Sequence, residues 1–420
     1  MENGYLKNDS LENNGPRGSC SDNRSPEKSG SENSCPIGNE SLQRTKKGCP
    51  HNGVNVITGA ERSEQYLPLL QGKRVAVLTN QTGMVGDVHL VDFLHASHCH
   101  IVGIFSPEHG FRGTADAGEH VANSTDEKTG IPIWSLYGSG SSKPSPEKMR
   151  AFDLLLFDLQ DVGLRFYTYY ASMARMMDAC AEYGKKMIVL DRPNPNGFYV
   201  DGPLLDMKHK SGVGWLPIPV VHGMTLGELA LMINGEGWLP QSRQCDLTVI
   251  TCENYTHRTR YVLPIAPSPN LPNNHAIYLY PSTCLFEGTV MSLGRGTSAP
   301  FEMYGHPDYQ GSDFSFTPRS VPGAKNPPLK DQKCFGIDLR DLPETEIWKE
   351  GFNLSYIIDA YRNLNMGARF FTPFFEKLTG VEYIRRDIMA GKSAAEIKVK
   401  WKADVESFKR QRKPYLLYEE

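Results

Sequence analysis

The sequence of 420 residues contains no run of about 18 or more consecutive apolar residues, which is the length that a membrane-spanning helix needs. It also lacks a large excess of charge, because 45 Lys and Arg residues against 48 Asp and Glu residues give a formal net charge of −3. We therefore expect no membrane insertion and no binding to nucleic acid. The nine cysteines form no CxxC pair, and their odd number favours free thiols in a reducing compartment.

Nucleotide and metal motifs are missing as well. The loop that follows the first expected strand contains Gly83 and Gly86 but matches neither GxGxxG nor GxxxxGK[ST]. No HxH or HExxH spacing accompanies His109 or His222, so zinc is not expected at either residue. The sequence predicts that the protein uses no metal and no cofactor.

Large aliphatic residues are almost absent from residues 1–53, which consist mainly of Asn, Ser, Gly, Lys, Glu and Pro. Such a segment buries too little apolar surface to offset the entropy lost on ordering, so we expect a disordered tail. The first ten residues have neither the positive start nor the apolar stretch of a secretory signal. On this basis the expected location is the cytoplasm.

Beyond the tail, short apolar runs recur about every 20 to 35 residues, the spacing of βαβ units. This pattern predicts an α/β domain over residues 54–266 with a largely parallel sheet covered on both faces. Helices are expected over residues 167–183 and directly after the capping box at Thr225. The expected strands are residues 74–79, 101–105, 131–136, 154–157 and 187–190.

A proline-rich stretch over residues 263–274 predicts a domain junction, because proline neither continues a helix nor pairs centrally in a sheet. A smaller α+β domain is expected over residues 275–420. Within it we predict a strand at residues 335–339, a helix at residues 356–363 and a terminal helix after Ser393. The apolar spacing of the terminal helix predicts core packing for Ile397, Trp401, Val405 and Phe408.

Polar side chains gather where three of the expected strands end. The carboxyl ends of parallel strands meet at one edge of a sheet, where open α/β folds bind ligands, so we expect one shared site. Acids, arginines and aromatic rings at this edge favour an enzyme over a binding module. The candidates after the three strands are Glu108, His109 and Arg112; Asp158, Asp161, Arg165, Tyr167 and Tyr169; and Arg192, Asn194 and Asn196.

The sequence contains several long motifs, in order from about Gly72 to the C-terminus. They are Thr79-Asn-Gln-Thr-Gly, Ser106-Pro-Glu-His-Gly-Phe-Arg-Gly, Phe157-Asp-Leu-Gln-Asp-Val-Gly-Leu-Arg-Phe-Tyr-Thr-Tyr, Asp191-Arg-Pro-Asn-Pro-Asn-Gly, Val221-His-Gly-Met-Thr-Leu-Gly-Glu, Pro267-Ser-Pro-Asn-Leu-Pro and Tyr280-Pro-Ser-Thr-Cys-Leu-Phe-Glu-Gly-Thr. Together these motifs resemble the exo-β-N-acetylmuramidase family typified by NamZ. This resemblance implies a Rossmann-like N-terminal domain, a smaller C-terminal domain and an active-site cleft. It also implies release of terminal N-acetylmuramic acid from the non-reducing end of small peptidoglycan-derived fragments, such as muropeptides or disaccharides with N-acetylglucosamine.

Glycoside hydrolysis needs an acid that protonates the leaving oxygen, and commonly a second carboxylate that acts as nucleophile or base. Glu108 is the candidate acid, since partial burial at a strand end raises the pKa of a carboxyl. Asp158 and Asp161 are the candidate second carboxylates, although either could be a structural partner of Arg165. If the substrate's acetamido group is the nucleophile, one Asp only orients it. Retention or inversion of configuration stays open.

Substrate recognition calls for other residue types. A planar arginine suits the lactyl carboxylate of N-acetylmuramic acid, and Arg112, Arg165 and Arg192 are the candidates. Tyr167 and Tyr169 either face the sugar or pack at a helix start. We expect further contacts with substrate from His109, Asn194, Asn196, His222 and Glu287, the last closing the cleft from the second domain.

Two other classes of protein fit parts of the pattern. A non-catalytic glycan-binding protein could use the same cleft, and Glu108 would then be dispensable. An esterase or amidase acting on cell-wall material is disfavoured, because the sequence has no GxSxG motif and no cysteine with an evident paired histidine.

Overall fold

The computed structural model describes residues 55–107, 111, 124–136 and 143–420, which belong to one compact unit. The expected disordered tail, residues 1–53, lies outside the described residues.

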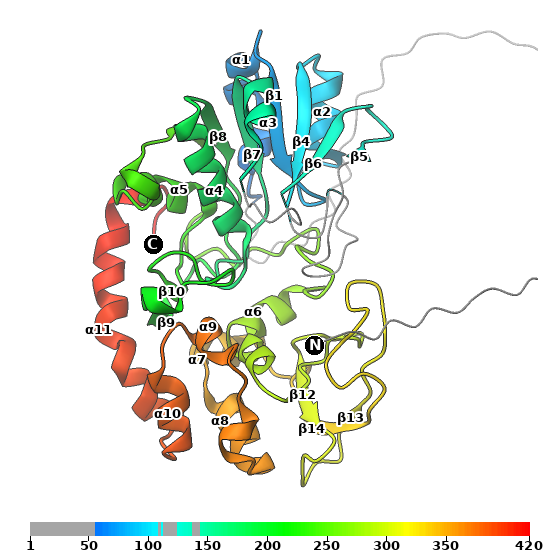
Figure 1. The fold of residues 1–420 in the computed structure, drawn as a ribbon, viewed down its shortest axis with the longest axis vertical. Coiled ribbons are helices and arrows are strands. Elements are labelled where there is room, and N and C mark those ends of the chain that lie inside the picture. Colours follow the sequence, from blue (N-terminus) through cyan, green and yellow to red (C-terminus); the bar gives the residue numbers. More distant parts are fainter. Residues whose placement is uncertain (1–54, 108–110, 112–123, 137–142) are drawn as a thin grey trace, which may run out of the picture. The chain divides into compact units, whose positions relative to one another are not determined.

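A seven-stranded sheet forms the first half of the described chain (Figure 1). Its strand order is β11-β8-β7-β1-β4-β6-β5, and every neighbouring pair is parallel except β5 with β6. The expected α/β fold with a largely parallel sheet is therefore confirmed. The edge strands β5 and β11 were not expected from the sequence. The strands are β1 (Val75–Thr79), β4 (Ile101–Ser106), β5 (Ser124–Thr125), β6 (Pro132–Ser135), β7 (Leu154–Asp158), β8 (Lys186–Leu190) and β11 (Asp246–Ile250).

Alternate residues of the central strands contribute to two separate hydrophobic cores, one on each face of the sheet. Val75 and Val77 of β1 pack in the core that contains α1 and α2, whereas Ala76 and Leu78 pack in the core that contains α3, α4 and α5. This alternation is the consequence of the two-residue period of a strand. The helices are α1 (Ser63–Leu70), α2 (Leu90–Ala96), α3 (Pro146–Ala151), α4 (Tyr169–Glu182) and α5 (Leu226–Gly235).

The second half of the described chain begins with α6 (Asn274–Thr283) and contains a small antiparallel sheet with the order β12-β14-β13. The expected strand, the expected helix near residue 356 and the terminal helix are present as β14, α8 and α11. The strands are β12 (Met303–His306), β13 (Ser315–Phe316) and β14 (Cys334–Asp338), and the helices are α7 (Glu344–Glu350), α8 (Ser355–Leu364), α9 (Phe375–Thr379), α10 (Tyr383–Met389) and α11 (Ala394–Arg412).

Short elements connect these parts. Two hairpins extend from the loops of the first half, and single turns of 3-10 helix occur along the chain. The hairpin strands are β2 (Met84–Val85) with β3 (Val88–His89) and β9 (Asp201–Leu204) with β10 (Pro219–Val221). The 3-10 helices are Gly59–Glu61, Met207–His209, Pro240–Ser242, Cys284–Gly288, Gly367–Phe370 and Lys413–Tyr415.

The long helix α11 and the segment after it return to the first half of the chain (Figure 1, red). Trp401 is buried and donates its indole N–H to Asp201 in β9 at 2.9 Å, which confirms its predicted core position. Past the helix, Tyr418 donates its hydroxyl to Asp191 at 2.7 Å, and the backbone N–H of Leu417 donates to Glu228 at 2.8 Å. The C-terminal segment thus satisfies buried carboxylates beside β8 and at the start of α5.

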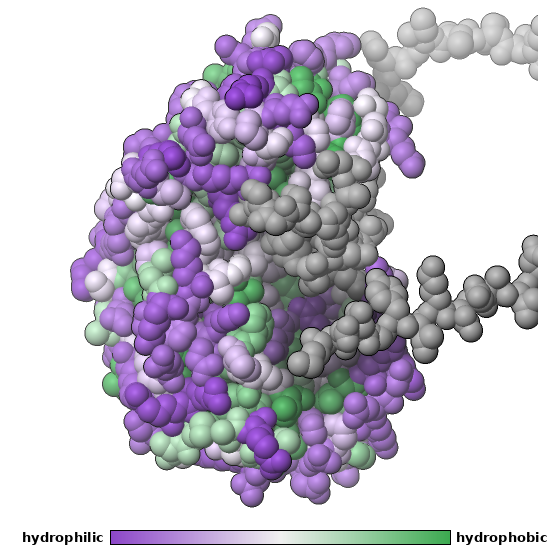
Figure 2. Space-filling model, in the orientation of Figure 1, coloured by the Kyte–Doolittle hydropathy of each residue, from purple (hydrophilic) through white to green (hydrophobic). Residues whose placement is uncertain are grey.

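The face of the molecule in Figure 2 is largely hydrophilic, with hydrophobic side chains in smaller groups between the polar ones. Among the described residues, no helix is both long enough and apolar enough to cross a membrane.

Candidate active site

Three of the candidate site residues, Glu108, His109 and Arg112, lie outside the described residues. Their roles stay predictions. The strand before them, β4, ends at Ser106, which is fully buried next to β1 in the sheet.

Asp158 and Arg192 form a closed ion pair. Asp158 ends β7 and Arg192 follows the neighbouring strand β8, so parallel pairing places them side by side. Arg192 donates Nε to one carboxylate oxygen at 2.5 Å and Nη2 to the other at 2.9 Å, and Nη2 also donates to the backbone of Met84. Burial opposes the charge of Arg192, but Asp158 outweighs it and raises the pKa of the guanidinium. The structure thus brings two candidates together, each already using the other as its partner.

Arg165 is fully buried, and its guanidinium donates to four backbone carbonyls. Nη1 contacts Pro203 and Ile218 at 2.6 and 3.0 Å, and Nη2 contacts Leu378 and Thr379 at 2.9 and 2.7 Å. Burial lowers the pKa of Arg165 to about 10. The side chain therefore joins the turn after β7 to the β9–β10 hairpin and to α9, which is how a structural residue behaves.

Asp161 lies in the turn between β7 and α4 with 6% of its surface exposed. Burial raises the pKa of its carboxyl to about 7, although the backbone N–H groups of Val162, Gly163 and Tyr170 pull the pKa down. Only Gly163 reaches full hydrogen-bond geometry, at 2.8 Å to Oδ1, and Oδ2 accepts no hydrogen bond from the described residues. A carboxyl that titrates near neutral pH has the property that general acid–base catalysis requires.

Asn194, Asn196 and His222 surround this turn. Asn194 donates its side-chain N–H to Met224 at 2.8 Å and accepts from the backbone of Asn196 at 2.8 Å, while Asn196 donates to Val162 at 2.9 Å. His222 accepts at Nδ1 a hydrogen bond from the backbone N–H of Met224. Burial, the larger cause, and the positive charge of Arg412, the smaller cause, lower the pKa of His222 to about 3. Asn196 thus holds the backbone next to Asp161, while Asn194 and His222 fix the backbone at Met224.

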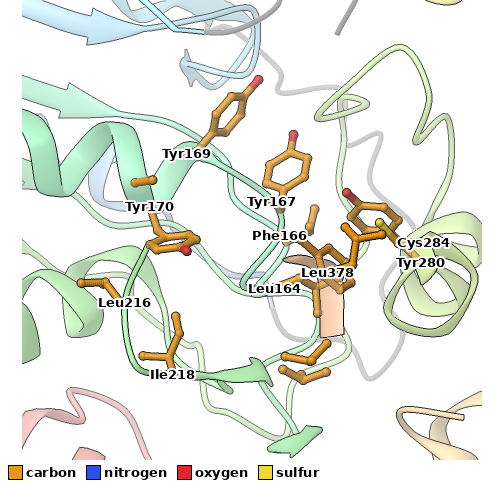
Figure 3. Packing of buried hydrophobic residues seen from close by; sticks show 14 of the residues in the cluster. Leu164, Phe166, Tyr167, Tyr169, Tyr170, Leu216, Ile218, Tyr280, Cys284 and Leu378 are labelled. Atoms are coloured by element: carbon orange, nitrogen blue, oxygen red, sulfur yellow. The ribbon is translucent and has the colours of Figure 1, made fainter. Parts of the chain in front are cut away.

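A cavity of about 120 Å³ contains the remaining candidates. Tyr167 and Tyr169 line it from the first half of the chain, and Glu287 lines it from the second half. Figure 3 shows the hydroxyls of these two tyrosines pointing to the same side, whereas the side chain of Tyr170 turns to the other. The other lining residues are Phe166, Thr168, Val213, Ser268, Asn270, Leu271, Tyr280, Arg295 and Phe301.

The two cavity tyrosines are held by groups from two of the sequence motifs that were not among the candidate site residues. Tyr167 donates its hydroxyl to the Pro267 carbonyl at 2.9 Å, and Tyr169 accepts from Asn80 Nδ2 at 2.8 Å. The Asn80 amide is oriented in turn by Thr82, whose N–H and hydroxyl both donate to Asn80 Oδ1. Burial raises the pKa of Tyr167 well above its usual value, so its hydroxyl keeps its proton. The loop after β1 therefore positions this wall of the cavity.

Glu287 lies beside Arg295, a second residue that the sequence analysis missed. Arg295 donates Nε at 2.8 Å and Nη2 at 2.5 Å to the same oxygen, Oε1 of Glu287. Burial disfavours the charge of Arg295, but Glu287 overcomes this and raises the pKa of the guanidinium. The available signal in the sequence was the pair of glycines, Gly294 and Gly296, on either side of a single arginine. Both adopt positive φ angles, +82° and +80°, that present the side chain on a tight turn.

Among the described residues, no cluster of three or more His, Cys, Asp or Glu side chains has an arrangement that could hold a metal ion. The six cysteines in this part of the chain are free thiols.

Comparison with known proteins places this architecture in a family. Residues 75–275 match the family described as exo-beta-N-acetylmuramidase NamZ, N-terminal, and residues 278–418 match its C-terminal counterpart. The peptidoglycan beta-N-acetylmuramidase NamZ of Bacillus subtilis (strain 168) is 37% identical over 401 residues, which cover 90% of this chain and 93% of that protein.

Two crystal structures of DUF1343 family proteins from Bacteroides fragilis NCTC 9343 have the same fold. One is 63% identical with a TM-score of 0.83 and covers 87% of this chain and 100% of its own. The other is 28% identical with a TM-score of 0.74, and the match covers 87% of this chain and 99% of that chain. From the matches over both halves, the chain belongs to the exo-β-N-acetylmuramidase NamZ family.

Proposed function

We propose that this protein is a glycoside hydrolase that releases N-acetylmuramic acid from the non-reducing end of peptidoglycan-derived fragments. The observation that carries the proposal is the 37% identity to the Bacillus subtilis β-N-acetylmuramidase over nearly the whole of both chains. Family matches over residues 75–275 and 278–418 cover both halves that contribute to the cavity.

The cavity supports a small carbohydrate as the ligand. Its walls combine aromatic rings, which suit the apolar C–H faces of a sugar, with a few convergent polar groups that suit hydroxyls. The rings of Tyr167 and Tyr169 lie edge to face with centres 4.9 Å apart. Ser268, Asn270 and Glu287 add polar atoms from the junction and from the second half of the chain.

For the chemistry, we assign Glu108 as the general acid and Asp161 as the second carboxyl group. Asp161 is favoured over Asp158 because Arg192 already occupies both oxygens of Asp158. Asp161 Oδ2 is buried and accepts no hydrogen bond from the described residues, and burial raises the pKa of the carboxyl to about 7. Asp161 is not among the residues that line the cavity, so it lies behind the cavity wall. A carboxyl with a pKa near 7 can both take up and release a proton near neutral pH.

Hydrolysis of a chromogenic β-N-acetylmuramide tests the proposal, with the corresponding β-N-acetylglucosaminide as the control substrate. We expect release from the muramide alone, and a loss of about 100-fold or more in Glu108→Gln, which is the scale of general acid catalysis. Folded wild type that binds muramide without releasing the chromophore would instead indicate a glycan-binding protein. The cytoplasmic location expected from the sequence stays a prediction.

A further inference from the structure

The lactyl carboxylate distinguishes N-acetylmuramic acid from N-acetylglucosamine, and an arginine is the side chain best shaped to recognise it. Two of the arginines that the sequence suggested are already occupied. The guanidinium of Arg165 donates to four carbonyls, and that of Arg192 is paired with both oxygens of Asp158. Nη2 of Arg192 also donates to the Met84 carbonyl at 2.9 Å, so neither guanidinium has a planar edge left for a second carboxylate.

Arg295 differs because its partner uses only one edge of the guanidinium. Nε and Nη2 both donate to a single oxygen of Glu287, and the Nη1 group donates to none of the described residues. The end-on edge formed by Nη1 and Nη2 is the second position at which a guanidinium binds a carboxylate with two parallel hydrogen bonds. Since Arg295 lines the cavity with 20% of its side chain exposed, a ligand in the cavity has access to the side chain.

The surroundings hold Arg295 in place before a ligand arrives. Its guanidinium lies 5.0 Å from the ring centre of Phe301, a cation–π distance, while Glu287 fixes the plane of the group. Gly294 and Gly296 allow the tight turn, and Thr297 closes it by donating its hydroxyl to the Gly294 carbonyl at 2.7 Å. A preorganised arginine loses little conformational entropy on binding, which favours selective recognition.

On the basis of the proposed function, we propose that Arg295 determines specificity for N-acetylmuramic acid by binding the lactyl carboxylate through its Nη1 and Nη2 groups. Glu287 acts as a positioning residue for Arg295, because its Oε1 accepts from Nε and Nη2 and so holds the plane of the guanidinium.

The test compares two chromogenic β-N-acetylmuramides that differ only at the lactyl group, one with the free carboxylate and one with the neutral amide. Arg295→Met should lower kcat/KM for the carboxylate substrate by about 10- to 100-fold, the scale of a hydrogen bond to a charged group. It should change kcat/KM for the amide by less than about threefold. Arg295→Lys keeps the charge but not the planar edge, so its loss should be intermediate.

A matched control is Arg385→Met. Arg385 also pairs with a glutamate, Glu376, at 3.2 Å and lies 5.5 Å from a phenylalanine ring centre, but it does not line the cavity. Arg385→Met should leave unchanged the ratio of kcat/KM for the carboxylate substrate to kcat/KM for the amide substrate. Equal losses on carboxylate and amide in both Arg295 variants would overturn the proposal. If Arg295→Met does not fold, the ratio in Arg295→Lys decides.

The outcome is separable from the activity itself. If folded wild type releases no chromophore, the hydrolase proposal fails, and calorimetric binding of free N-acetylmuramic acid and its lactyl amide then tests Arg295. Tighter binding of the acid by wild type, with the difference lost in Arg295→Lys and Arg295→Met, supports the role in recognition. Equal binding of the acid and the amide by wild type rejects it.

Discussion

Arg165 and Arg295 represent two regions of the molecule that use the same kinds of polar residue in opposite ways. Around Arg165, Asn194 and Asn196, most side-chain donors are directed at backbone carbonyls. Around the cavity, Arg295 has one carboxylate partner and one edge without a hydrogen bond to the described residues. The first region is a buried scaffold and the second is a wall that a ligand can contact.

The comparison shows that residue type at a strand end does not by itself identify a binding group. A donor that is fully paired inside the protein stabilises the fold, whereas a donor with an unpaired edge in a cavity is available to substrate. Arg192 belongs with the scaffold, although it follows a strand and the sequence analysis made it a candidate site residue.

The largest expected effect comes from replacing the scaffold arginine. Arg165→Met leaves four buried carbonyls without their donor, and each costs about 1 to 3 kcal/mol, so we expect the free energy of unfolding to fall by roughly 5 kcal/mol. Arg295→Met should lower it by less than about 1.5 kcal/mol. Urea unfolding of both variants measures the difference, and similar losses would remove the distinction between scaffold and wall.

A pH effect comes next in size. Burial holds the pKa of Asp161 at about 7, above its unfolded value of 3.8, so the folded state binds more protons between these values. The free energy of unfolding should therefore fall as pH rises from about 4 to about 7, by at most roughly 4 kcal/mol from this group. Asp161→Asn removes that contribution. The free energy of unfolding of the variant should therefore rise relative to that of wild type as pH increases from about 4 to about 7.

Unfolding free energies of both proteins at pH 4, 6 and 8 test this expectation. Asp191 is an internal control, because burial raises its pKa to about 6 in either protein. In both proteins Asp191 should cause a smaller fall in the free energy of unfolding, which ends near pH 6. Parallel curves for wild type and Asp161→Asn would show that Asp161 does not have the raised pKa.

The smallest effect concerns the hydrogen bond that holds the cavity wall to the loop after β1. Asn80 lies in the loop after β1 and donates its side-chain N–H to the hydroxyl of Tyr169, which lines the cavity. A double-mutant cycle with Asn80→Ala and Tyr169→Phe should give a coupling energy of about 1 kcal/mol in unfolding free energy, typical of one hydrogen bond. Additive losses would mean that the loop does not position the tyrosine.

Much of the fold could be predicted because apolar runs and capping boxes are local signals. The five expected strands and the helices after Thr225 and Ser393 are all present. The edge strand β11 was not predicted, since only one of its five residues is buried, three are partly buried and one is exposed, so its apolar pattern is weak. Strand order depends on packing between distant segments, which a local pattern does not contain.

The site was harder to predict for a related reason. Sequence analysis placed Tyr167, Tyr169 and Glu287 in the site, and the structure shows that they line one cavity. It could not show that Arg165 is paired with carbonyls of residues 378 and 379, more than 200 positions along the chain. It also passed over Arg295, because that arginine follows no strand of the main sheet.

The return of the C-terminal segment to the sheet has a consequence for biosynthesis. Asp191 and Glu228 are made early, yet Tyr418 and Leu417 supply hydrogen bonds to their carboxylates. While the ribosome is still translating the second half, these buried acids lack those donors, so the nascent first half cannot complete its native packing. Folding of the sheet is therefore expected to finish only after residues 412–418 have left the exit tunnel, with both halves becoming native together.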